Sequence, residues 1–153
     1  MKRLLVACLL LAFPVSADAQ AQSVMGTWLS ESKKAHVRLE PCADAARGPL
    51  CGVVAALFSP RGPDGVAVAP EAAVDIHNAD PARRSRKILG MVMLYDFKKG
   101  SEPNSFEDGT IYSAENGKTY KANLSLQADG TLRLRGYVGL PMFGETQVWT
   151  RVK

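Results

Sequence analysis

The sequence is poor in the side chains that most often carry catalysis or bind metal ions. Among 153 residues there are only two His, His36 and His77, and three Cys, and aromatic residues make up 7%. A hydrolytic triad needs a nucleophile, a base and a group that orients the base. No serine of this chain lies in a Gly-x-Ser-x-Gly elbow. We therefore expect a protein that is not an enzyme.

Long hydrophobic runs are missing beyond the N-terminus. Residues 4–15 form an apolar run that follows two basic residues. The run is shorter than the roughly 20 residues that a membrane span needs, and small residues follow it at the spacing of a signal-peptidase site. The sequence predicts a signal peptide over residues 1–19, with cleavage after Ala19 or, alternatively, after Ala21. The expected mature domain is 20–153, exported and without a transmembrane segment.

A strong charge of one sign is also lacking. The formal net charge is +4, and basic residues are scattered apart from a short run at 83–87. Nucleic-acid-binding proteins usually show a basic stripe with interleaved aromatic residues, and this chain has neither. We expect no nucleic-acid partner and interpret the basic run as a solvated surface patch.

Cysteine is scarce, but two cysteines remain after the predicted cleavage. Cys42 and Cys51 flank a segment that is rich in turn-forming residues. An even pair in an exported chain favours a disulfide, because the compartment is oxidising. A metal pair or a reactive dithiol would need further Cys or nearby His companions, which are few here. We predict a disulfide between Cys42 and Cys51.

Short strands separated by turn signals are abundant. Apolar and polar residues alternate over 35–40 and over 118–126, as in half-buried strands. Asn116-Gly117 and Asp129-Gly130 are strong hairpin signals. The other expected strands are 51–58, 66–68, 91–97, 110–113, 131–139 and 145–152. The pattern predicts an all-β fold, a single up-and-down antiparallel barrel of roughly eight strands. A barrel of that size either is filled by its side chains or holds one small ligand.

One short helix is expected within this barrel. Asp80 can accept hydrogen bonds from free backbone amides, and Pro81 suits the first helical position. Gly90 would end the helix, so we expect it to run from Pro81 to about Ile88, with Asp80 as its cap.

The segment before this helix concentrates donor atoms. Asp75, His77, Asn78 and Asp80 lie within six residues and could in principle ligate a divalent cation. Calcium, however, takes six to eight oxygens, and zinc prefers more than one His or Cys. The alternative is an Asx-turn that leads into the helix cap. We favour the turn and expect neither a metal nor a cofactor.

Several short motifs follow one another along the whole mature chain. They are Gly26-Thr27-Trp28, Cys42 with Cys51-Gly52, Asn78-Ala79-Asp80-Pro81 followed by Arg83 and Arg86, Gly90, Gly109-Thr110-Ile111-Tyr112, Asn116 to Tyr120, Leu134 to Gly139, and Gln147-Val148-Trp149-Thr150-Arg151. The first resembles the glycine–x–tryptophan motif that opens lipocalins. The ordered set resembles a family of exported bacterial proteins of unknown function with a lipocalin-like (calycin) barrel.

The resemblance implies a barrel outside the cytoplasm, periplasmic or secreted, that binds a small apolar molecule and has no established reaction. In lipocalins an arginine from a late strand stacks on the tryptophan of the first motif, at the closed end of the barrel. Here the resemblance implies that Arg151 stacks on Trp28, with Arg135 as the runner-up. Such a contact contributes about 0.5–2 kcal/mol, and its role would be structural.

Aromatic and methionine side chains on the expected strands are candidates to line a cavity. The tyrosines lie on four different strands and could ring a cavity mouth, or they could pack with their hydroxyls in water. The two methionines share one strand face, so they line the cavity or pack under the helix. The candidates are Tyr95, Tyr112, Tyr120, Tyr137, Trp149, Met91 and Met93.

Two functions fit these patterns. The first is an exported protein that binds a small apolar ligand in a cavity of a few hundred Å³. The second is an envelope protein-interaction or structural module with a packed barrel interior, which would use an outer face or the basic helix over 81–88 to bind an acidic partner or surface.

Overall fold

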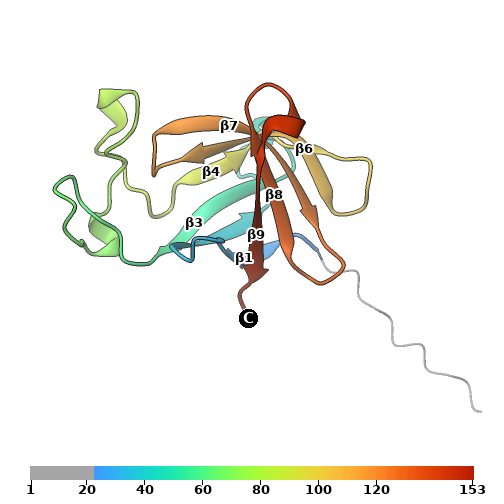
Figure 1. The fold of residues 1–153 in the computed structure, drawn as a ribbon, viewed down its shortest axis with the longest axis horizontal. Helices are drawn as coiled ribbons and strands as arrows, with labels where there is room; N and C mark the ends of the chain where they lie inside the picture. Colours follow the sequence, from blue (N-terminus) through green and yellow to red (C-terminus); the bar gives the residue numbers. More distant parts are fainter. Residues whose placement is uncertain (1–22) are drawn as a thin grey trace, which may run out of the picture.

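The computed structural model describes residues 23–153, so the predicted signal peptide and both cleavage sites lie outside the described residues. The strands are β1 (Gly26–Leu29), β2 (Ala35–Glu40), β3 (Cys51–Leu57), β4 (Val92–Tyr95), β5 (Lys98–Lys99), β6 (Ser105–Ser113), β7 (Lys118–Leu126), β8 (Leu132–Tyr137) and β9 (Glu145–Arg151). They form one antiparallel sheet in the order β4-β3-β2-β1-β9-β8-β7-β6-β5 (Figure 1). A pairing between β4 and β6 closes eight of them into a barrel and leaves β5 as an extra strand. The predicted all-β barrel is confirmed.

Alternation of apolar and polar residues explains why these segments form a barrel wall. In β2, Val37 and Leu39 are buried while Arg38 between them is exposed. Hairpins join β6 to β7 and β7 to β8 at the expected sites, where Gly117 and Gly130 adopt positive φ angles of 68° and 82°. Side chains of the inward face form one core, which includes Trp28, Val37, Leu39, Leu94, Phe97, Leu124, Leu132, Leu134 and Trp149.

The predicted disulfide is present. Cys42 follows β2 and Cys51 opens β3, and the two sulfurs are bonded. The bridge therefore fixes the turn between two neighbouring strands, including the short 3₁₀ turn η1 (Ala45–Arg47).

Helical structure in residues 23–153 is limited to 3₁₀ turns, namely η1, η2 (Pro70–Ala72), η3 (Pro81–Arg83) and η4 (Pro141–Phe143). No helix in this part of the chain is long and apolar enough to cross a membrane. As expected, Asp80 caps η3, and its carboxylate accepts a 3.0 Å hydrogen bond from the Ala82 amide.

The helix that we expected to continue to Ile88 is absent, and this prediction was wrong. After η3 the Arg86 carbonyl accepts a 2.9 Å hydrogen bond from the Asp75 amide, and Lys87 forms a β-bridge with Val74. These pairings commit Arg86 and Lys87 to the backbone of residues 74–75, so the local helix signal stops after one turn.

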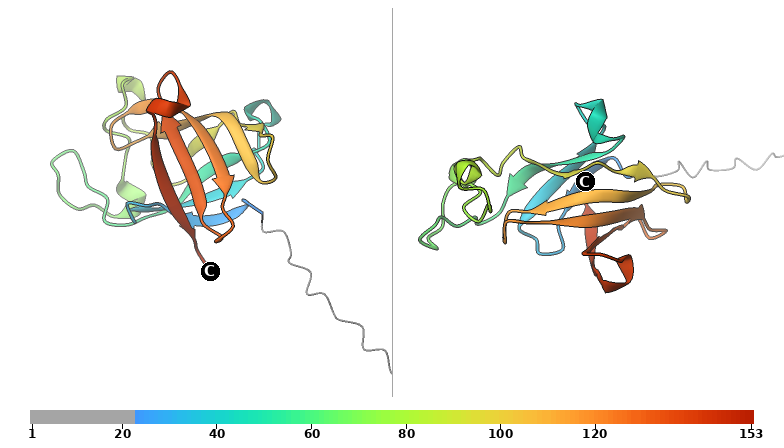
Figure 2. Two further views of the ribbon diagram at one scale, coloured as in Figure 1. Left: turned by 45° about the vertical axis from the view of Figure 1, so that its right-hand side comes forward. Right: turned by 90° about the horizontal axis from the view of Figure 1, so that it is seen from above.

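The connection from β3 to β4, residues 58–91, stands to one side of the barrel (Figures 1 and 2). The strand expected over 66–68 is reduced to an isolated bridge between Arg61 and Ala67. Because this connection lies beside the end of the barrel where β1, β3 and β6 finish, it shapes the opening described next.

Candidate functional site

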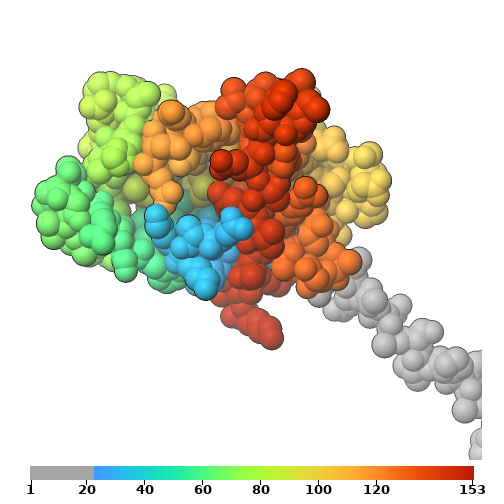
Figure 3. All heavy atoms as spheres, in the orientation of Figure 1, coloured from blue at the N-terminus to red at the C-terminus, as the bar shows by residue number. Residues whose placement is uncertain are grey.

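A cavity of about 490 Å³ lies between the barrel interior and the 58–91 connection. Its inner wall is apolar and includes Val37, Val54, Met91, Ile111 and Trp149, all of them buried. Its outer lining comes from residues 30–35, 57–61, 74–77 and 113–115. In the space-filling view the connection in green, the tip of the β6–β7 hairpin in orange and the β1–β2 turn in blue lie on the same side of the molecule (Figure 3). The barrel interior thus opens to solvent on this side.

The structure separates the residues that we grouped as cavity candidates. Met91, Met93, Tyr112 and Trp149 line the cavity, whereas Tyr95, Tyr120 and Tyr137 do not. The four tyrosines therefore do not ring one mouth, and the following contacts give the reasons.

Tyr95 lies in a separate outer cleft of about 270 Å³, with the Arg47 guanidinium 4.2 Å from its ring centre. The Tyr120 ring packs against the core, and its hydroxyl accepts a 2.9 Å hydrogen bond from Asn116 at the hairpin tip. Tyr137 is buried beside the β8–β9 loop. Burial, together with the charges of Asp108 and Glu107, raises the pKa of Tyr137.

Gln147 lines the cavity as well, and we did not select it from the sequence. It is two residues before Trp149 in β9, so both side chains face the same way. The Trp149 indole donates a 2.9 Å hydrogen bond to Gln147 Oε1. Alternate residues of a strand face the same way, so the assignment of Trp149 to the cavity could have identified Gln147 as a second lining residue.

The mouth of the cavity carries both charge signs. Lys34 and Glu115 form a 2.9 Å ion pair between the β1–β2 turn and the β6–β7 hairpin, and both side chains are exposed. Arg61 donates a 2.9 Å hydrogen bond to the Gly65 carbonyl within its own loop. His77 is exposed at the same rim.

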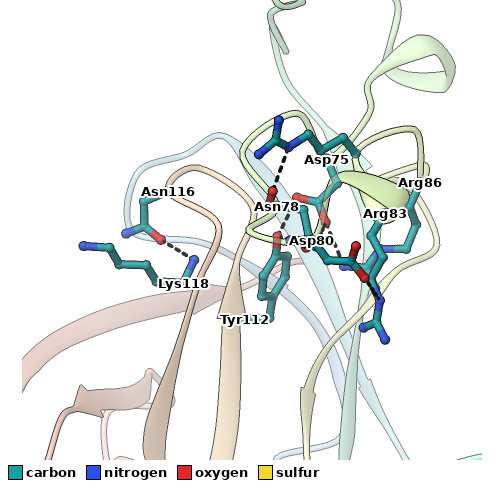
Figure 4. A network of polar contacts seen from close by, with 9 residues as sticks. Asp75, Asn78, Asp80, Arg83, Arg86, Tyr112, Asn116 and Lys118 are labelled. Atoms are coloured by element: carbon teal, nitrogen blue, oxygen red, sulfur yellow. Dashed lines mark hydrogen bonds and ion pairs between the residues drawn. The ribbon is translucent and has the colours of Figure 1, made fainter.

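A buried polar cluster fastens the connection to the barrel (Figure 4). Asp75 is fully buried and accepts hydrogen bonds from the Tyr112 hydroxyl at 2.6 Å, from Asn78 Nδ2 at 2.7 Å and from Arg86 Nη2 at 2.8 Å. Asn78 Nδ2 also donates to the Tyr112 hydroxyl at 2.9 Å. Because Tyr112 belongs to β6 and the other three to the connection, the cluster fixes one wall of the cavity.

The cluster also sets the protonation of its members. Burial by itself raises the pKa of the Asp75 carboxyl, but hydrogen bonds from Tyr112, Asn78 and Arg86, with the charge of Arg86, outweigh burial and lower it. Burial and the hydrogen bond to the Asp75 carboxylate raise the pKa of Tyr112 to about 12. Asp75 is therefore an anion at neutral pH, and Tyr112 is its neutral donor.

The segment that we weighed as a cation site forms turns. Asn78 Oδ1 accepts a 2.9 Å hydrogen bond from the Asp80 amide, which is an Asx-turn, and Asp80 in turn caps η3. Within residues 23–153 no group of three or more His, Cys, Asp or Glu is arranged to hold a metal ion. The donor atoms of Asp75, Asn78 and Asp80 are used to shape the loop.

Trp28 and Arg151 lie at the other end of the barrel, where β1 begins and β9 ends. The Arg151 guanidinium lies 4.2 Å from the Trp28 ring centre and donates hydrogen bonds to the Met25 and Ser23 carbonyls. The Trp28 indole donates to the Val24 carbonyl at 2.8 Å. These contacts tie the segment before β1 to the last strand and cover this end.

Arg135, the runner-up for that contact, has a different place. Its guanidinium donates hydrogen bonds to the Pro141 carbonyl at 2.6 Å, the Met142 carbonyl at 3.2 Å and the Thr146 hydroxyl at 2.7 Å. Arg135 therefore holds the β8–β9 loop, in which Met142 and Phe143 are exposed.

Comparison with known proteins supports the fold and places the family. A solved structure described as "Protein HP1028 from the human pathogen Helicobacter pylori belongs to the lipocalin family" is similar to this chain with a TM-score of 0.67 and 23% sequence identity. The similarity covers 86% of this chain and 84% of that one, and it shows a lipocalin-like fold. No curated protein matches the sequence. The model of a family described as "Uncharacterized protein conserved in bacteria (DUF2147)" matches residues 26–151. This chain belongs to that family of bacterial proteins.

Proposed function

We propose that this protein is an exported, non-catalytic binding protein for a small, mainly apolar molecule. The observation that carries the proposal is the cavity of about 490 Å³ with its apolar inner wall. Small-molecule sites are typically concave, largely apolar and of this size. A lipocalin-like fold is compatible with such a role, and the Cys42–Cys51 disulfide is compatible with export to an oxidising compartment.

The alternative, an interaction module with a packed interior, is less well supported. A cavity of this size is at odds with a packed barrel. The basic residues that would form its binding surface are engaged within their own loop. Arg83 pairs with Asp80, Arg84 Nε donates to the Asn78 carbonyl, and Arg86 pairs with Asp75.

Binding of N-phenyl-1-naphthylamine, a neutral probe that fluoresces in apolar surroundings, tests the proposal. We expect saturable binding to the wild-type protein and a loss of binding in Met93→Trp, because the larger side chain fills the cavity that Met93 lines. Val148→Trp is the matched control, since Val148 is exposed on the outer face of β9. Absence of saturable binding to the wild type, or equal binding to all three proteins, would contradict the proposal. Native mass spectrometry of freshly purified protein would identify a co-purified ligand.

A further inference from the structure

Gln147 points into the barrel but is not packed there. Strand alternation places it on the same face as Trp149, which is 1% exposed, and it pairs with the inward, buried Leu134. Its neighbour Val148 faces outward. Gln147 is nevertheless exposed, and it borders the cavity.

The orientation of the Gln147 amide follows from the chemistry of its partner. An indole N–H is only a donor, so the group 2.9 Å from Trp149 Nε1 has to be the amide oxygen. The Nε2 group, with two N–H donors, is therefore the free end of the amide. Within the described residues no hydrogen bond engages Gln147 Nε2.

Several other polar groups around the cavity are already paired, including Arg61, which donates to the Gly65 carbonyl. The Tyr112 hydroxyl donates to Asp75, and the charges of Lys34 and Glu115 cancel in their ion pair. The Gln147 amide thus presents uncommitted donors beside an apolar wall. A ligand without an acceptor would strip water from these donors and leave them unpaired, which costs binding free energy.

We propose that Gln147 selects ligands by donating hydrogen bonds to an acceptor group, most favourably a carboxylate, at one end of an otherwise apolar chain. This inference rests on the proposed function, and it adds the ligand's polarity and its orientation. The acceptor group lies at Gln147, and the apolar chain lies along Met91, Met93 and the rest of the inner wall.

Dodecanoate and dodecylammonium test the inference, because they have the same chain length but different head groups. The carboxylate of dodecanoate accepts hydrogen bonds, whereas the ammonium group of dodecylammonium only donates them. Each displaces N-phenyl-1-naphthylamine below its micelle concentration, and the ratio of the two affinities is measured. We expect the wild type to prefer dodecanoate. In Gln147→Glu the preference falls by about tenfold or more, or reverses.

Gln147→Glu keeps an oxygen that accepts the Trp149 indole hydrogen bond, but it also places a negative charge in the cavity. Gln147→Met removes the amide donors without adding a charge, so a purely structural role of Gln147 would leave the ratio unchanged in Gln147→Met. Thr150→Glu adds the same charge on an exposed residue of the same strand and should also leave it unchanged. In Gln147→Met we expect loss of the preference and no reversal.

A failure of the inference can be distinguished from a failure of the proposed function. If the neutral probe does not bind the wild type, the proposed function fails, and the inference with it. If the probe binds but the affinity ratio is the same in the wild type and in Gln147→Met, only the inference is overturned. A ratio that changes in Lys34→Gln and not in Gln147→Glu would place the head group at the mouth and would also overturn it.

Discussion

The Tyr112 hydroxyl donates a 2.6 Å hydrogen bond to the buried Asp75 carboxylate, across the boundary between β6 and the connection that borders the cavity. This bond links a strand of the barrel wall to the 58–91 connection, which contains only short 3₁₀ turns and isolated β-bridges. The stability of the cavity wall and the affinity of the cavity should therefore change together when the bond is removed.

Replacing Tyr112 with Phe should lower the free energy of unfolding by about 1–3 kcal/mol, because a buried hydrogen bond to a charged acceptor is lost. It should also weaken probe binding, since Val74, Ile76 and His77 in the connection line the cavity. Denaturant unfolding and probe titration measure the two effects. Tyr95→Phe removes a hydroxyl outside the cavity and serves as the control; a comparable loss in both variants would count against a role of the Asp75 cluster.

Stability should fall at alkaline pH through Tyr112. Its pKa is raised from an ordinary value of 10 to about 12 in the folded protein. Between these values the unfolded chain releases the proton and the folded protein retains it, so the stabilisation present below pH 10 is lost as the pH rises to 12. The stability difference between wild type and Tyr112→Phe should shrink by up to about 3 kcal/mol over this range. A difference that stays constant in denaturant titrations from pH 9 to pH 12 would refute the assignment.

Gly117→Ala should be strongly destabilising. Gly117 has a φ of 68°, and a Cβ at this position would lie 1.8 Å from the His77 carbonyl oxygen, where the hairpin tip meets the connection. Gly139 has a similar φ of 74° with no atom within 4 Å of its Cβ position, so Gly139→Ala isolates the backbone cost. That cost is about 1–2 kcal/mol, and Gly117→Ala should exceed it. Unfolding free energies decide the point, and equal losses would mean that the hairpin contact is unimportant.

Arg151→Lys should reduce stability by about 1–2 kcal/mol although the charge is kept. A lysine cannot maintain the planar fork that stacks on Trp28 and reaches two carbonyls at once. Arg133→Lys, at an exposed residue of β8, should have little effect. Thermal unfolding of both variants tests this expectation, and hydrogen exchange at Val24 and Met25 should rise only in Arg151→Lys.

Features that depend on neighbouring residues could be derived from the sequence. Alternation in residues 35–40 and 118–126, the Asn116-Gly117 hairpin and the Asp80 cap are local patterns, and the structure contains each of them. The arrangement as a barrel followed from the number and spacing of such strands. The Cys42–Cys51 disulfide followed because only two cysteines were expected in the mature chain.

The sequence did not indicate which polar residues serve which purpose, because that depends on long-range contacts. The helix predicted after Asp80 does not continue beyond one turn, because Arg86 and Lys87 pair with the backbone of residues 75 and 74. Asp75 was a possible cation ligand until Tyr112 and Arg86, which are distant in the sequence, were placed beside it. Four tyrosines looked equivalent on four strands, yet only Tyr112 borders the main cavity.

The sequence by itself determined the strands of the barrel wall, the tight hairpins between them and the side chains that face inward. These features depend on side-chain alternation and turn chemistry, which act over a few residues. Only the tertiary structure decided that the interior is hollow on one side. A cavity is the space that remains when all strands and the 58–91 connection are in place. For the same reason Gln147, an ordinary polar residue in the sequence, became the amide donor at its wall.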